Sequence, residues 1–144
     1  MIQAVDTSVL IDTSVLILRE RNADVAAWFE AQLLADELAV CDMVRLEYLV
    51  GARNAGDYDL LADALASLRQ VPIEPLDWVR ALDVQRTLAR QTGGGQRAVK
   101  IPDLLIAAAA ERAQLPLVHY DEDYDRISAI TGQPTRWVTP RGTA

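Results

Sequence analysis

Short apolar segments alternate with longer amphipathic segments along most of the chain. The apolar segments contain mainly valine, leucine and isoleucine, a pattern typical of strands that are buried on both faces of a parallel sheet. Strands are therefore expected at residues 9–11, 38–41, 115–119 and 136–138. Residues 71–73 form at most a short edge strand, because Pro72 has no N–H to donate to a neighbouring strand.

Amphipathic segments with apolar residues at helical spacing separate these strands. Asn22 is a good N-cap for one helix, Asp42 is expected to cap a second, and Asp57 is expected to begin a third. Further helices are expected through residue 20 and over residues 42–53, 57–68, 76–91, 103–113 and 124–130. This alternation predicts an α/β fold with a mostly parallel central sheet, covered by helices on both faces.

The length and composition fit a single globular domain. The chain has 144 residues, 51% of them hydrophobic, so it can bury a core without a disulfide or a metal. Charged residues such as Asp6, Asp12 and Arg19 interrupt each apolar run, so no membrane span is expected. The N-terminus lacks the basic segment of a signal peptide, and Cys41 is the only cysteine. We therefore expect a cytoplasmic protein.

The charge balance limits how the chain can meet nucleic acid. Its 14 basic and 21 acidic residues give a net charge of −7, which excludes a general basic coat for phosphate. An acidic chain can still act on nucleic acid when its carboxylates hold cations that face the phosphate. Lys100 is the only lysine, so it is the only candidate for a lysine-dependent mechanism.

Four carboxylates stand where strands end or helices begin. Asp12 and Asp121 follow apolar strands, and Glu47 and Asp103 lie in the first turns of mainly apolar helices. A carboxylate on a buried face is costly unless it is paired or bound to a metal. The carboxyl ends of parallel strands are also where such sheets bind ligands. An oxygen-only ligand set favours Mg²⁺ or Mn²⁺ over zinc.

Simpler interpretations exist for these residues. Each aspartate taken alone is typical of a helix N-cap, and the acidic run after His119 is typical of a solvated turn. A calcium loop is excluded, because its required glycine and glutamate positions hold Arg126 and Gly132. The alternative function is a non-catalytic binding module whose acidic residues are structural caps.

Four motifs, taken in order, point to a known family. They are Val-Leu-Ile-Asp12-Thr-Ser, Arg-Leu-Glu47-Tyr-Leu, Pro-Asp103-Leu-Leu-Ile-Ala-Ala and His-Tyr-Asp121-Glu-Asp123-Tyr. Together they resemble the four motifs of the PIN domain. The short length and the motif wording are similar to the VapC toxins of bacterial toxin–antitoxin pairs.

The resemblance implies a fold and an activity. It implies one PIN-like α/β/α sandwich over residues 1–144 and a Mg²⁺-dependent endoribonuclease, with Mn²⁺ as a substitute ion. It also implies a homodimer and inhibition by a cognate VapB-like antitoxin. Carried over by position, the acidic quartet is Asp12, Glu47, Asp103 and Asp121, Asp123 is a further metal ligand, and Thr13 is the hydroxyl residue beside the first aspartate. Candidates to hold the RNA backbone are Arg19, Arg21, Arg86, Arg90, Arg97 and Lys100.

The sequence departs from the family pattern at two positions. The first motif is doubled, so Asp6 competes with Asp12 for the role of first acid, and Tyr124 stands where phenylalanine is common. We favour Asp12, because a continuous apolar segment precedes it, whereas the segment before Asp6 contains Gln3. A helix that began after Asp6 would also place Asp12 within a run of β-branched residues, which form poor helix interiors.

Overall fold

The computed structural model describes residues 7–91 and 93–144 and contains a central five-stranded sheet with the order β3-β2-β1-β4-β5. All four neighbouring strand pairs are parallel. The strands are β1 (Val9–Ile11), β2 (Leu38–Cys41), β3 (Arg69–Val71), β4 (Leu117–His119) and β5 (Thr135–Trp137).

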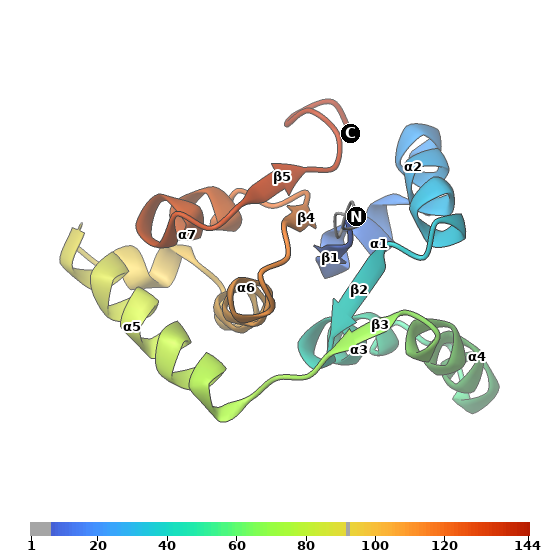
Figure 1. Cartoon of the computed structure of the whole chain (residues 1–144), viewed down its shortest axis with the longest axis horizontal. Coiled ribbons are helices and arrows are strands. Elements are labelled where there is room, and N and C mark those ends of the chain that lie inside the picture. The colour runs from blue at the N-terminus through green and yellow to red at the C-terminus, as the bar shows by residue number, and fades with distance from the viewer. Residues whose placement is uncertain (1–6, 92) are drawn as a thin grey trace, which may run out of the picture.

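Helices connect these strands. They are α1 (Thr13–Leu18), α2 (Ala23–Leu34), α3 (Asp42–Leu49), α4 (Ala55–Ala66), α5 (Pro75–Gln91), the 3₁₀ turn η1 (Gly95–Ala98), α6 (Ile101–Ala113) and α7 (Asp123–Thr131). In Figure 1, α5, α6 and α7 lie on the left, and α2 and α4 lie on the right. Within the described ranges, no helix combines the length and the apolar character needed to cross a bilayer.

The burial pattern explains why the strands are apolar throughout. Every residue of β1, β2 and β4 is buried, although successive side chains of a strand point to opposite faces. Both faces of the sheet centre are therefore covered, which confirms the predicted α/β fold with helices on both sides. The edge strands β3 and β5 are more exposed.

Helix α6 is the most deeply buried helix among the described residues. Every residue from 103 to 110 is buried, four of them alanines, whose small side chains let neighbouring elements approach closely. Helix α6 contacts α3, α5 and α7. The first turn of a buried helix thus presents Asp103 at the interior of the molecule, 3% exposed.

Two predicted helix starts are wrong. Asp42 does not cap α3 but is its first residue, and its carboxylate accepts a hydrogen bond from the Ile73 N–H at 3.0 Å. Helix α3 also ends at Leu49, not near residue 53. Helix α4 begins after Asn54, whose side chain accepts a hydrogen bond from the N–H of Asp57. The Asp42 carboxylate does not cap its helix because it accepts a hydrogen bond from a distant part of the chain. Asp57 does not begin its helix because the side-chain amide of Asn54 caps the helix earlier in the sequence.

Candidate metal centre

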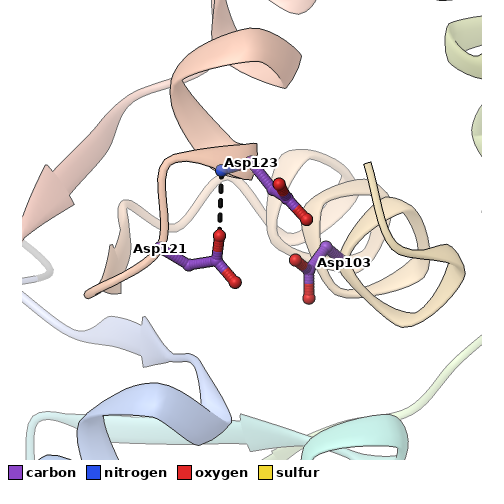
Figure 2. Close-up of side chains that lie close together, drawn as sticks. All are labelled: Asp103, Asp121 and Asp123. Atoms are coloured by element: carbon purple, nitrogen blue, oxygen red, sulfur yellow. Dashed lines mark hydrogen bonds between the residues drawn. The ribbon is translucent and has the colours of Figure 1, made fainter. Parts of the chain in front are cut away.

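Three aspartates from the C-terminal third of the chain meet at one place. Asp103 lies in the first turn of α6, Asp121 follows β4, and Asp123 is the first residue of α7. One carboxylate oxygen of each lies within 4.8 Å of the others. Figure 2 shows the three carboxylates turned toward one another. The structure therefore gathers three of the five predicted metal ligands directly.

Backbone hydrogen bonds fix this arrangement. The N–H of Asp123 donates to Asp121 Oδ1 at 3.0 Å, the dashed line in Figure 2. The N–H of Asp121 donates to His119 Nδ1 at 3.1 Å, and the N–H of Lys100 donates to Asp123 Oδ2 at 3.0 Å. The last bond ties the start of α6 to the start of α7, so the two acid-bearing helix starts keep a fixed separation.

Asp12 reaches the same region from the end of β1. It is 3% exposed and caps α1, since its Oδ2 accepts from the Ser14 N–H at 3.1 Å and from the Ser14 hydroxyl at 2.5 Å. The Tyr124 hydroxyl lies 2.5 Å from Asp12 Oδ1 and 3.2 Å from Asp103 Oδ1. A single phenol thus connects Asp12 with the aspartate cluster. Asp6, the rejected alternative, lies outside the described residues.

Glu47 stands at the margin of the cluster. It lies in the second turn of α3, not in the first turn as predicted, and its Oε1 accepts a hydrogen bond from the Thr13 hydroxyl at 2.9 Å. Burial raises the pKa of Glu47, and the charges of Asp12 and Asp121 act in the same direction. Thr13 was predicted only as the hydroxyl residue beside Asp12, and in the structure its hydroxyl contacts Glu47.

Lys100 lies inside the cluster. Its ammonium is 2.8 Å from Asp121 Oδ2, 3.0 Å from Asp123 Oδ2 and 3.4 Å from Asp103 Oδ2. Partial burial acts to lower the pKa of Lys100, but hydrogen bonds to Asp121 and Asp123 outweigh it and raise the pKa. From the sequence, Lys100 was a candidate to hold the RNA backbone. In the structure its ammonium is the counter-ion of the three aspartates.

Asp103 and Asp123 respond to this crowding in opposite directions. Burial, the close approach of the Asp123 side chain and the charges of Asp12 and Asp121 raise the pKa of Asp103 to about 9. Burial also acts to raise the pKa of Asp123, but the neighbouring Asp103 side chain and the hydrogen bonds from Lys100 outweigh it and lower the pKa. Close carboxylates cannot all ionise without compensation, and its raised pKa makes Asp103 the easiest member of the cluster to protonate.

The donor set fits a hard divalent cation. Every candidate ligand is a carboxylate, which suits Mg²⁺ and Mn²⁺. Among the described residues, the buried Asp103 Oδ2 has no hydrogen-bond partner, and such orphaned atoms are uncommon in folded proteins. A cation bound by this oxygen would satisfy it and relieve the repulsion among the three carboxylates.

The arginine candidates lie apart from the acids. Arg19 places its guanidinium over the ring of Phe29, 4.5 Å from the centroid. Arg21, Arg86, Arg90 and Arg97 are exposed, and within the described ranges no ion pair joins any of these arginines to the cluster.

Two hydroxyl groups of the site were not singled out from the sequence. One is the hydroxyl of Tyr124, which was recorded only as a departure from the family pattern. The other is Ser14, whose hydroxyl donates to Asp12 and accepts from the Tyr120 N–H at 2.9 Å. The only sequence signal for either residue is its position beside an acid of a motif.

Among the candidate acids in the described residues, Glu47 is the one that lines a cavity of about 480 Å³. Its lining comes from α1, α3, α4 and the segments beside them. The lining residues are Ile17, Glu20, Glu47, Tyr48, Gly51, Arg53, Asp57 and Leu61.

Known proteins share this sequence pattern. Residues 5–130 match the PIN domain. The chain is 52% identical over 120 residues to "Ribonuclease VapC18" of Mycobacterium tuberculosis, covering 83% of this chain and 88% of that protein. It is 41% identical over 134 residues to "Ribonuclease VapC51" of the same species, covering 93% and 95%.

Solved structures share the fold. The DNA-bound VapBC of Salmonella typhimurium aligns with a TM-score of 0.73 at 16% identity, covering 92% of this chain and 98% of that one. VapBC-1 from nontypeable Haemophilus influenzae aligns with a TM-score of 0.67 at 20% identity, covering 91% and 98%. Because the sequence match spans most of the chain and the fold agrees, the chain belongs to the PIN-domain family, among the VapC proteins.

Proposed function

We propose that this protein is a metal-dependent endoribonuclease toxin of the VapC type, which hydrolyses RNA phosphodiester bonds at the acidic cluster. The observation that carries the proposal is the convergence of Asp103, Asp121 and Asp123 around a buried oxygen that lacks a hydrogen-bond partner among the described residues. The names of the relatives, ribonucleases VapC18 and VapC51, support the same activity. In this proposal residues 1–144 act as one domain.

Mg²⁺ is the proposed ion, with Mn²⁺ able to replace it. When bound, such an ion lowers the pKa of a coordinated water and neutralises the charge that develops on the phosphate and the leaving oxygen. The proposed ligands and catalytic acids are Asp12, Glu47, Asp103 and Asp121, with Asp123 as a further ligand and Thr13 in support.

The acids have different tasks in this mechanism. Asp103 must give up its proton before its carboxylate can serve as a ligand, because its pKa lies at about 9. Glu47 keeps its orientation through Thr13, and its raised pKa suits a group that accepts a proton from an attacking water. Lys100 offers the positive charge nearest to the cluster for an RNA phosphate, and Arg19, Arg21 and Arg97 are proposed to contact the backbone farther out.

The proposed partners are an antitoxin of the VapB type and a second copy of the chain. Solved relatives are described as VapBC and toxin–antitoxin complexes. Large apolar side chains are exposed on α4 and α5: Leu60, Leu76, Trp78, Val79 and Leu82. Such exposed apolar groups mark protein contacts. A chain that stays monomeric in light scattering and does not bind the product of the adjacent upstream gene would contradict these partners.

Cleavage of RNA tests the proposal. Purified protein is expected to cut RNA with Mg²⁺ or Mn²⁺ and to stop in excess chelator, and Asp121→Asn is expected to be inactive. Asp125→Asn is the matched control, because Asp125 lies two residues further on and contacts the Trp137 indole N–H instead of the cluster. The alternative, a binding module with structural caps, predicts no cleavage and no rise in melting temperature on addition of metal. Cleavage that persists undiminished in chelator would refute the proposal.

A further inference from the structure

Tyr124 is buried at the point where two acids from opposite ends of the chain meet. Its side chain has no exposed surface, and its hydroxyl lies between Asp12 Oδ1 and Asp103 Oδ1. The rest of the ring contributes to the apolar core. A phenylalanine would fill nearly the same space, so packing alone does not account for the hydroxyl.

The hydroxyl has one proton and two carboxylate neighbours. Because the hydroxyl lies 2.5 Å from Asp12 Oδ1 and 3.2 Å from Asp103 Oδ1, the two carboxylates share its single proton, and Asp12 is the nearer acceptor. Both oxygens of Asp12 then have donors, because Ser14 donates to Oδ2. The position and rotation of the Asp12 carboxylate are thereby fixed.

The same hydroxyl sets which oxygen of Asp103 faces the cluster. Oδ1 lies toward Tyr124, whereas Oδ2 lies 3.4 Å from the Lys100 ammonium, on the side of Asp121 and Asp123. Oδ2 is also the oxygen that has no hydrogen-bond partner among the described residues. The oxygen that is free to bind a cation is therefore the one turned away from Tyr124.

The ring itself is held in place. His119 packs against it with the ring centroids 4.9 Å apart, and Trp137 packs against His119 at 5.0 Å. Tyr124 also follows Asp123 directly in the first turn of α7. A hydroxyl on so rigid a support can act as a fixed reference for the carboxylates that it contacts.

We propose that Tyr124 is a positioning residue that orients Asp12 and Asp103 for a shared divalent ion. This inference rests on the proposed function, because it concerns the ion of that site. Residues that hydrogen-bond to metal ligands without contacting the metal orient those ligands, and removing such a residue typically weakens metal binding by about 10- to 100-fold. Tyr124 acts through the two aspartates and is not itself a ligand.

Tyr124→Phe tests the inference, with Tyr120→Phe as the matched control. Tyr120 also loses a hydroxyl near the end of β4, but that hydroxyl accepts from the N–H groups of Gly142 and Ala144 and contacts no acid of the cluster. We expect Tyr124→Phe to bind Mn²⁺ about tenfold more weakly in calorimetric titration, and Tyr120→Phe to bind it normally. An unchanged or tighter dissociation constant for Tyr124→Phe would overturn the inference.

Kinetics give a second readout that a purely structural defect would not produce. Tyr124→Phe should cleave more slowly at limiting Mn²⁺, with an unchanged KM for RNA, and should recover at high Mn²⁺. Slow cleavage that no Mn²⁺ concentration restores contradicts the inference. Wild-type protein that neither binds Mn²⁺ nor cleaves RNA instead refutes the proposed function, so the two failures are distinguishable.

Tyr124→Phe could also lose metal binding by misfolding, so a second measurement uses a protein that retains Tyr124. Tyr48, Tyr58 and Tyr120 can be replaced together by phenylalanine, so that Tyr124 is the only tyrosine. Its Raman tyrosine doublet reports whether the phenol donates a hydrogen bond. The doublet should change as Mn²⁺ is added, because the acceptors become ligands. An unchanged doublet at saturating Mn²⁺ contradicts the inference.

Discussion

Asp77 and Asp103 are two buried aspartates in the first turns of neighbouring helices, yet their surroundings differ. Asp77 is 1% exposed in α5, and Asp103 is 3% exposed in α6. The Arg112 guanidinium donates hydrogen bonds to the Asp77 carboxylate from Nε at 2.9 Å and from Nη2 at 3.1 Å. The Glu74 N–H donates a third hydrogen bond to this carboxylate at 2.8 Å. Asp77 is therefore fully compensated.

Asp103 lacks this compensation. It lies among other acids, its Oδ2 has no hydrogen-bond partner among the described residues, and the nearest cation is the mostly exposed Lys100 side chain at 3.4 Å. A buried acid with a dedicated guanidinium stabilises the fold, whereas one that remains partly unpaired keeps the capacity to bind a cation. This difference is why we treat Asp77 as structural and propose Asp103 as a metal ligand, although both lie in the first turn of a helix.

The largest expected effect follows from Asp103→Asn. Loss of a metal ligand removes several kcal/mol of charge stabilisation, so RNA cleavage should fall by about a thousandfold or more. The fold should survive and should melt at the same or a higher temperature without metal, because one source of repulsion is gone. Cleavage assays and thermal melts in chelator check both parts. Cleavage near the wild-type rate would remove Asp103 from the site.

The opposite outcome is expected for Asp77→Asn. Removing the acid leaves Arg112 without its main partner, and breaking a buried pair costs about 3–5 kcal/mol. Since the Arg112 side chain is 27% exposed, we expect a smaller loss, about 2–3 kcal/mol, in the free energy of unfolding. Urea unfolding measures this loss. The folded Asp77→Asn variant should bind Mn²⁺ with the same affinity as the wild type. Weaker Mn²⁺ binding would mean that Asp77 also contributes to the metal site.

The pH dependence of metal binding sharpens the contrast. Because the pKa of Asp103 is raised from 3.8 to about 9, the neutral form is favoured in the folded protein without metal. The stability contributed by this group is then complete below about pH 4 and is lost as the pH rises toward 9.

Metal affinity changes in the opposite direction, because binding releases the Asp103 proton. Between pH 6 and 8, Mn²⁺ affinity should rise by about tenfold per pH unit in calorimetric titration. Asp103→Asn should abolish this dependence, and Asp77→Asn should retain it. A flat profile for the wild-type protein would show that Asp103 is already ionised.

Replacement of Lys100 gives the smallest expected effect. Its ammonium occupies the same carboxylate oxygens that a divalent ion would use, so Lys100→Gln should remove a competitor. Since 61% of the side chain is exposed, we expect Mn²⁺ to bind only about two- to fivefold more tightly. Titration at low ionic strength measures the change. Weaker binding would mean that Lys100 supports the metal site instead of competing with the ion.

The sequence was sufficient to predict the fold class, the family and the buried central strands. Uninterrupted apolar runs at Val9–Ile11 and Leu38–Cys41 identified strands buried on both faces, and both strands are present. The predicted fold class and the PIN-domain resemblance are confirmed. Helix starts were less predictable. The Asp42 carboxylate bonds to an N–H that is 31 residues away, which no local capping preference reveals.

The residues of the candidate site could be predicted from the sequence, but the hydrogen bonds and ion pairs between them could not. The motifs named the acids, and their catalytic and metal-binding roles stay predictions. The bridge from Tyr124 to Asp12 spans 112 residues, and the ion pair of Lys100 with Asp121 spans 21. Such contacts depend on how α6, α7 and β1 pack, and hydrophobic periodicity describes each element only by itself.

The position of β1 between β2 and β4 has a consequence for synthesis of the chain. The first acid follows β1 near the N-terminus, while the aspartate cluster forms only after α6, β4 and the start of α7 have been made. A nascent chain therefore carries an incomplete set of acids until most of it has left the ribosome, since domains fold as units during translation. For a protein that cuts RNA, this order delays activity until the chain is nearly finished.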